Sequence, residues 1–192
     1  MIDPALGRVP YERLAQERER VLGQQKSGRL GVQSAIPGMT WQERGPSNAG
    51  GVTRAELFDL NDPTRKKVWV GSPSGGLWYT NDITDANAIW TPVSNSWESM
   101  VVTCLAANPS NPQIMYAGTG DGYQYTTGGG IWKTINGGTT WTRLSSTIPG
   151  TFYGTLAASF GYIQRLVVTG NGQIFAVTRY GVVRSADGST MW

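Results

Sequence analysis

Tryptophan recurs at nearly constant spacing along this chain of 192 residues. The recurring tryptophans are separated by 49, 51 and 51 residues, and they are Trp41, Trp90, Trp141 and Trp192. A fixed period of roughly 20 to 50 residues is typical of proteins assembled from repeated supersecondary units. Because one such unit cannot bury its apolar face alone, the repeat constrains the fold more than any other feature of the sequence.

The segment before each tryptophan contains three strand-like stretches in the same order. "RAELFDL", "KVWVGS" and "GGLWYT" precede Trp90; "MVVTCLAA", "IMYAGT" and "GGIWKT" precede Trp141; "IQRLVVT", "IFAVT" and "YGVVRS" precede Trp192. Turns rich in Asn, Pro, Gly and Asp separate the stretches. Each tryptophan then begins a fourth stretch, and four strands per period of about 50 residues predict the blades of a β-propeller.

We therefore predict an all-β fold, a partial β-propeller of about three four-stranded blades over residues 39–192. Residues 1–38 form a separate N-terminal helix and linker, because "VPYERLAQERERVLGQQ" is rich in helix formers and lies between Pro10 and Gly23. Trp41 lacks the three preceding strands, which predicts a ring-closing strand at residues 40–44. Known propellers have ~4–8 blades. We therefore expect the chain to be a fragment that needs remaining blades or another chain to close the propeller.

Composition removes several classes of function. The chain has no histidine, which excludes Ser-His and Cys-His nucleophile pairs, and its one cysteine, Cys104, lies in the apolar stretch "VVTCLAA", where a buried thiol is expected. A net charge of +3 without a clustered basic face predicts no nucleic-acid binding. No apolar run approaches the ~20 residues of a membrane span, and the N-terminus lacks the pattern of a secretory signal.

Two loops have a superficial likeness to ligand sites. "GTGDG" (118–122) does not open a helix, so it is read as a hairpin loop and not as a phosphate site. "NDITDAN" (81–87) lacks the glycine and distal glutamate of a calcium loop, so a polar turn is expected. We therefore predict neither a metal nor a cofactor.

The turns "TINGGTTW" (134–141) and "SADGSTMW" (185–192) resemble the Asp-box of bacterial neuraminidase-type repeats, which runs Ser/Thr, any, Asp, any, Gly, any, Thr, Trp. Asn136 replaces the aspartate of the second turn and Ser189 replaces a glycine of the third. We expect the Asp side chain to accept turn amides, the glycine to adopt positive φ, and the tryptophan to seal the gap between blades. The structural residues that the resemblance implies are Thr134, Asn136, Gly138, Trp141, Ser185, Asp187 and Trp192, with Trp90 and Trp41 at matching positions.

The wider pattern, including "VGSPSGGLWYT" and "NPSNPQIMYAGTGDG", is similar to the sortilin-like and xyloglucanase-like propellers of large secreted bacterial proteins. This resemblance implies a secreted or cell-surface location and, for some members, a type IX secretion tag, which is not visible here. A xyloglucanase-like enzyme would carry a carboxylate just before the first Gly-Gly, where Pro73 stands. Glycoside hydrolysis needs two facing carboxylates, and we nominate no catalytic residue.

In a four-stranded blade, the loops between the second and third strands share an end with the connectors between blades. We predict a ligand-binding face at this end, since aromatic rings with a few polar groups suit sugar rings or extended peptides. Its candidate residues are Asp121, Tyr123, Tyr125, Arg179, Tyr180, Trp97 and Tyr153. Trp97 could instead pack between blades, whereas Tyr123 and Tyr125 lie in the longest insertion and are the better candidates.

These expectations leave three hypotheses for the function. The first is a secreted or cell-surface module that binds glycan or protein. The second is a glycoside hydrolase whose carboxylates lie mostly outside this chain or include Asp121. The third is a structural or assembly subunit whose open edges pair with another chain.

Overall fold

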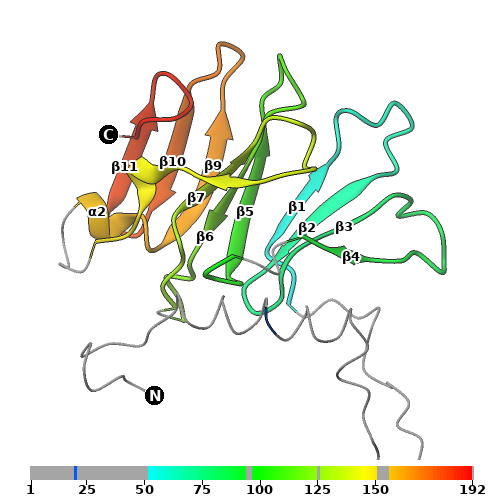
Figure 1. Ribbon diagram of the computed structural model, residues 1–192, viewed down its shortest axis with the longest axis horizontal. Helices are drawn as coiled ribbons and strands as arrows, with labels where there is room; N and C mark the ends of the chain where they lie inside the picture. The colour runs from blue at the N-terminus through cyan, green and yellow to red at the C-terminus, as the bar shows by residue number, and fades with distance from the viewer. Residues whose placement is uncertain (1–19, 21–51, 94–96, 125, 151–155, 192) are drawn as a thin grey trace, which may run out of the picture.

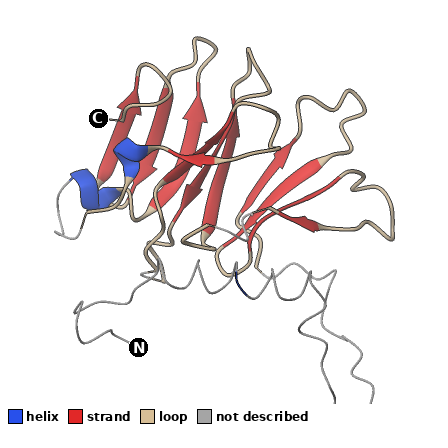
Figure 2. Cartoon of the chain, in the orientation of Figure 1, coloured by secondary structure: helices blue, strands red, loops and turns tan. Residues whose placement is uncertain are grey.

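The computed structural model describes residue 20 and residues 52–93, 97–124, 126–150 and 156–191, whose regular secondary structure is almost entirely β-strand (Figures 1 and 2). Three antiparallel sheets follow one another along the chain. Apart from residue 20, which is helical, the predicted N-terminal helix and linker lie outside the described residues, as does the closing strand with Trp41. Three further residues of interest also lie outside them: Tyr125, Tyr153 and Trp192.

The first two sheets are four-stranded meanders in which each strand pairs with the next. The first blade comprises β1 (Ala55–Phe58), β2 (Val68–Ser72), β3 (Gly76–Thr80) and β4 (Thr91–Pro92). The second blade comprises β5 (Val102–Ala107), β6 (Met115–Thr119), β7 (Ile131–Thr134) and β8 (Thr142–Arg143). Both β4 and β8 begin directly after the tryptophan of their unit, as the repeat predicts.

The third blade contains β9 (Ile163–Val168), β10 (Ile174–Thr178) and β11 (Gly181–Ser185), in the order β11-β10-β9. The connector from β8 to β9 includes the short helices η1 (Ser145–Thr147) and α2 (Leu156–Ser159). The predicted fold class is therefore confirmed: the described chain consists of consecutive blades of a partial propeller.

The meander connectivity gives the blades two distinct ends (Figure 1). The loops β2–β3, β6–β7 and β10–β11 lie at the end where the chain crosses to the next blade, which we call the loop end. The loops β1–β2 and β3–β4 and their equivalents lie at the opposite end, which we call the turn end. The first strand of each blade contacts the first strand of the next, β1 with β5 and β5 with β9, and the hydroxyl of Thr103 in β5 donates to the carbonyl of Ile163 in β9 at 2.6 Å.

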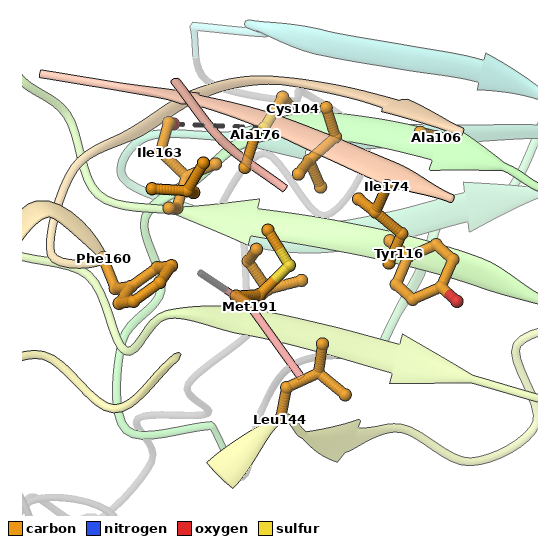
Figure 3. Close-up of a cluster of buried hydrophobic side chains, with 12 residues drawn as sticks. Cys104, Ala106, Tyr116, Leu144, Phe160, Ile163, Ile174, Ala176 and Met191 are labelled. Atoms are coloured by element: carbon orange, nitrogen blue, oxygen red, sulfur yellow. Dashed lines mark hydrogen bonds between the residues drawn. The ribbon is translucent and has the colours of Figure 1, made fainter. Parts of the chain in front are cut away.

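Apolar side chains fill both gaps between blades. The gap between the first and second blades holds Trp69, Leu77, Trp97, Val102, Met115 and Ala117. The gap between the second and third blades includes Cys104, Tyr116, Ile131, Phe160, Ile163, Ile174 and Met191 (Figure 3). Each large side chain buried in this way contributes about 1.5–3 kcal/mol to stability, so contacts between blades help to hold the fold together.

Glycine in the second strand of a blade sets the distance to the next blade. A Cβ atom on Gly118 in β6 would lie 2.4 Å from the Cys104 sulfur and 2.6 Å from the Cγ2 atom of Ile163. Only glycine therefore lets β9 approach this closely. Burial among these residues raises the pKa of the Cys104 thiol to about 12, which makes it unreactive at neutral pH, as the sequence predicts.

Candidate functional site

The β6–β7 loop is the longest insertion at the loop end, and its base is a closed bridge. The amide of Asp121 donates to the carbonyl of Thr126 at 2.8 Å, and the amide of Thr126 donates back at 3.0 Å. The amide of Gly128 donates to the carbonyl of Gly161, in the connector to the third blade, at 2.8 Å. The loop is thus fastened both to its own hairpin and to the next blade.

Asp121 anchors the loop from the inside, since its side chain is fully buried. Its Oδ1 atom accepts the Tyr123 amide at 2.9 Å, and the two guanidinium nitrogens of Arg54 lie 3.4 Å and 3.3 Å from Oδ1 and Oδ2. Arg54 directly precedes β1, so this ion pair joins the first blade to the second. Among the described residues, Oδ2 finds no partner with hydrogen-bond geometry.

Tyr123 is the most exposed aromatic residue of the described loop end. The residue is 79% exposed, and the Arg54 guanidinium carbon lies 5.3 Å from its ring centroid. This distance is within the range of a cation–π contact, which holds the ring above the arginine. One arginine therefore contacts both the buried carboxylate and the exposed ring.

A second cationic and aromatic group lies in the β10–β11 turn. The Arg179 guanidinium carbon lies 5.6 Å from the ring centroid of Tyr162 and 5.8 Å from that of Tyr180. The two rings meet edge to face at 6.4 Å, and the Tyr162 hydroxyl lies 3.2 Å from the Thr127 hydroxyl of the second blade. Tyr180 remains 40% exposed, so this group also reaches the surface.

Gly122 brings the two groups together. A Cβ atom on Gly122 would lie 2.4 Å from the Gln164 amide nitrogen and 4.0 Å from the Cβ atom of Arg179. The loop that carries Tyr123 therefore lies directly against the third blade. The described loop end gathers residues from all three blades, which we call the tyrosine–arginine face: Arg54, Tyr123, Gln164, Arg179 and Tyr180.

An open cavity of about 540 Å³ continues from this face between the first strands of the blades. Arg54 and Gln164 belong to both the face and the cavity wall, which also includes Glu56, Thr103 and Arg165. The wall is polar and carries charges of both signs. It could accommodate a hydroxylated ligand that extends inward from the tyrosine–arginine face.

Trp97 lies in the interior and not on this face. Its ring is 3% exposed, stacks on Trp132 at 4.4 Å, and meets Trp141 edge to face at 5.7 Å. Trp97 belongs to the apolar cluster between the first and second blades, which explains its burial. We therefore assign Trp97 to packing and leave it out of the candidate site.

The turn between β7 and β8, at the turn end of the second blade, forms hydrogen bonds among its own polar groups. The Asn136 side-chain oxygen accepts the Thr134 hydroxyl and the Thr140 amide, both at 2.9 Å. Gly138 has a φ of +88°, and its carbonyl accepts the indole N–H of Trp141 at 3.1 Å. This turn is therefore a packed structural element.

The third turn repeats the pattern with a carboxylate. Asp187 Oδ1 accepts the Thr190 amide at 2.7 Å, the Ser185 hydroxyl at 2.8 Å and the Ser189 amide at 2.9 Å. These bonds, that of the Thr190 amide first, hold the pKa of Asp187 well below its usual range. In the first blade, Trp90 is half-buried directly before β4.

Sequence reasoning missed three residues of the loop end: Arg54, Tyr162 and Gln164. Arg54 lies 67 positions from its partner Asp121, and no local pattern marks such a pair.

In the described part of the chain, no group of three or more His, Cys, Asp or Glu residues could hold a metal ion. No helix described here is long and apolar enough to span a membrane.

No protein-family model and no curated protein sequence matches this chain. Its structure is similar to that of an ancestral GH74 enzyme, with a TM-score of 0.54 and 16% identity over 72% of this chain and 18% of that one. Two weaker matches are a GH74 enzyme from Niastella koreensis (TM-score 0.44, 18% identity, 66% of this chain and 19% of that one) and a GH74 xyloglucanase from Xanthomonas campestris (TM-score 0.38, 12% identity, 74% and 30%). This chain spans less than a third of each neighbour. At 16% identity, the likeness to the ancestral GH74 enzyme shows a shared fold.

Proposed function

We propose that this chain is a glycan-binding propeller module and that the tyrosine–arginine face is its binding surface. The observation that carries the proposal is the position of Tyr123. Its ring is 79% exposed, lies over the Arg54 guanidinium, and belongs to a loop packed against Gln164 and Arg179. A ring fixed in this way is an exposed platform with polar groups around it.

This arrangement suits a sugar for two physical reasons. The apolar face of a pyranose ring can stack on an aromatic ring, and the fixed tyrosine loses little conformational entropy when it is covered. Guanidinium and amide groups donate hydrogen bonds to sugar hydroxyls. The shared fold with a glycoside hydrolase supports the choice of a glycan over a protein ligand. A secreted or cell-surface location remains part of the proposal.

Binding is favoured over catalysis by the state of Asp121. Hydrolysis of a glycosidic bond needs two carboxyl groups that face the scissile bond. Asp121 is instead fully buried, paired with Arg54, and bonded to the amide of its own loop. The hydrolase hypothesis therefore places its catalytic groups outside the residues described here.

The test is affinity electrophoresis of the protein in gels that contain soluble polysaccharides, with xyloglucan, mannan, xylan and mixed-linkage glucan as probes. We expect at least one of these polysaccharides to retard the protein. Tyr123→Ala should weaken that binding about tenfold, because one aromatic contact contributes ~0.5–1.5 kcal/mol beyond the area it buries. Ile135→Ala is the matched control, since Ile135 is 69% exposed at the turn end.

Equal retardation of the two variants would place the binding surface elsewhere. No retardation by any probe would favour the protein-ligand hypothesis. Release of reducing sugar from the same polysaccharides separates binding from hydrolysis. Turnover of any of these polysaccharides would support the hydrolase hypothesis, and turnover that persists in Asp121→Asn would place the catalytic groups outside the described residues.

A further inference from the structure

We propose that a cleft at the turn end, between the first and second blades, is a further ligand site that takes a single pyranose residue of a glycan. This turn-end cleft has a volume of about 380 Å³. It lies at the opposite end of the blades from the tyrosine–arginine face, so it goes beyond the binding surface proposed above and does not depend on it. The lining residues that carry the argument are Lys67, Trp69, Tyr79, Thr91, Pro92 and Thr139.

The two junctions between blades have the same layout at the turn end, so they can be compared position by position. Trp69 in the first blade and Tyr116 in the second are each the second residue of the second strand. A Cβ atom on Gly138, in the turn of the second blade, would lie 2.2 Å from the Cη2 atom of Trp69. The Tyr116 hydroxyl donates to the carbonyl of Gly188, in the turn of the third blade, at 3.2 Å. In each junction an aromatic ring therefore meets the turn of the next blade.

The second junction is closed by hydrogen bonds. Lys133 is the cross-strand partner of Tyr116, and its ammonium donates to the Gly188 carbonyl at 2.9 Å and to the Ser189 hydroxyl at 3.3 Å. With the bond from the Tyr116 hydroxyl, three hydrogen bonds join the second blade to the turn of the third. This arrangement leaves the turn held directly against the ring.

The first junction departs from this arrangement and is open. Tyr79 is the cross-strand partner of Trp69 and stands where the second junction has Lys133. The nearby cation, Lys67, reaches the carboxylate of Asp59 in its own blade at 3.0 Å and does not bridge to the turn. The space beside the turn is the turn-end cleft. The cleft therefore arises from one exchange of side-chain types between two otherwise matched junctions.

The walls of the turn-end cleft combine an aromatic platform with hydrogen-bonding groups. The Tyr79 ring is half-buried against Trp69, with ring centroids 4.9 Å apart, and the Lys67 ammonium lies 5.1 Å from the Tyr79 centroid. The hydroxyl-bearing residues Thr91 and Thr139 are exposed at the rim. Pockets of ~300–1,000 Å³ with apolar walls and a few polar groups suit small molecules. A pyranose ring can stack on Tyr79 while its hydroxyls meet the ammonium and the threonines.

The structure also argues against two other kinds of occupant. The Val93 amide donates to the carbonyl of Leu77 in β3 at 2.8 Å, so the adjacent Pro92 faces the outer edge of β4. Proline has no N–H to offer, which opposes the addition of a peptide strand at this edge. Lys67 is paired with the buried carboxylate of Asp59, so the cleft has no net charge to attract an ion. A neutral hydroxylated ring remains the best fit.

The test is a titration of the nitrogen-15-labelled protein with the methyl glycosides of glucose, galactose, xylose and mannose, followed by proton–nitrogen correlation spectra. We expect at least one of them to shift the amide signals of Gly137 and Gly138, which line the turn-end cleft, in a saturable way. The Kd should be on the order of 1 mM, as expected for a ligand of this size. The amides of Gly122 and Tyr123 report on the tyrosine–arginine face, so the spectra distinguish the two sites.

Three variants make the result specific. Thr91→Trp should weaken binding at least about tenfold, because Thr91 is exposed and is the cross-strand partner of Tyr79, so the new ring covers the platform. Tyr79→Ala removes the platform and should have the same effect. Val182→Ala, at a residue 67% exposed in the third blade, is the control and should leave the affinity unchanged.

Three outcomes would overturn the proposal. Unchanged Gly137 and Gly138 signals with all four glycosides would show that the turn-end cleft takes no pyranose. Shifts confined to Gly122 and Tyr123 would place sugar binding on the tyrosine–arginine face alone, which would leave the proposed function intact. Full affinity in Thr91→Trp would place the site outside the cleft. Saturable shifts at Gly137 that persist in Tyr123→Ala would support the turn-end cleft even if the polysaccharides fail to bind the loop end.

Discussion

Each end of the blades contains a buried carboxylate, and the two carboxylates differ in how many hydrogen bonds they receive. At the turn end, Asp59 receives the amide and side-chain N–H groups of Asn61, the indole N–H of Trp69 at 3.0 Å and the Lys67 ammonium at 3.0 Å. At the loop end, Asp121 receives one amide and a long contact from Arg54, and one of its oxygens has no hydrogen bond among the described residues. The buried carboxylate is therefore fully hydrogen-bonded at the turn end and incompletely hydrogen-bonded at the loop end.

The surfaces of the two ends differ in the same direction. The turn end keeps Trp69 buried and Trp90 and Trp141 half-buried, and the second and third blades share one hydrogen-bonded turn there. The loop end instead exposes Tyr123 and Tyr180 beside arginines. Repetition is what a scaffold requires, because each blade must present the same contact to the next. An insertion that departs from the repeat and exposes aromatic rings is better suited to a ligand. We therefore predict that substitutions in the repeated turns of the turn end affect stability and that those on the tyrosine–arginine face affect polysaccharide binding.

The largest expected effect comes from Gly138 at the turn end. Gly138→Ala puts a Cβ atom 2.2 Å from the Trp69 ring on a backbone with φ of +88°. We expect a loss of about 3 kcal/mol in the free energy of unfolding, from overpacking and from the left-handed backbone together. Chemical denaturation followed by tryptophan fluorescence measures it.

Gly172→Ala separates the two causes of that loss. Gly172 has a φ of +82°, and its nearest neighbour would lie 3.7 Å from the new Cβ atom. Gly172→Ala should lower the free energy of unfolding only by the cost of placing alanine in a left-handed backbone conformation, about 1 kcal/mol. Equal losses at the two glycines would show that the contact between Trp69 and the turn adds nothing.

A smaller effect is expected from protonation of the third turn. Because the folded state lowers the pKa of Asp187, this carboxylate stabilises the fold at neutral pH, and its contribution is lost as the pH falls below the usual aspartate range. Asp187→Asn should lower the melting temperature at pH 7 and have a smaller effect at pH 2. Thermal unfolding at the two pH values measures the difference, and a pH-independent effect would contradict the assigned role.

The sequence predicted the scaffold well because the scaffold repeats. The strands around Trp69, Tyr116 and Phe175 lie where three aligned units place them. The candidate site was harder to predict, since its geometry depends on contacts between blades. Arg54 meets Asp121 across the first gap, and Tyr162 meets Thr127 across the second. Trp97 was predicted to lie on the binding face, but it stacks on Trp132 in the interior. The sequence does not show whether an aromatic residue in a connector points outward or inward.

The smallest expected effect on stability is that of Tyr123→Ala, and it tests the comparison most directly. Because the residue is 79% exposed and its described aromatic contact is the cation–π interaction with Arg54, the free energy of unfolding should change by no more than about 0.5 kcal/mol. The same variant should lose most of its polysaccharide binding. Denaturation and affinity electrophoresis on one preparation measure both quantities. A loss of stability as large as that of Gly138→Ala would mean that Tyr123 supports the scaffold, and the division of roles between the two ends would then be wrong.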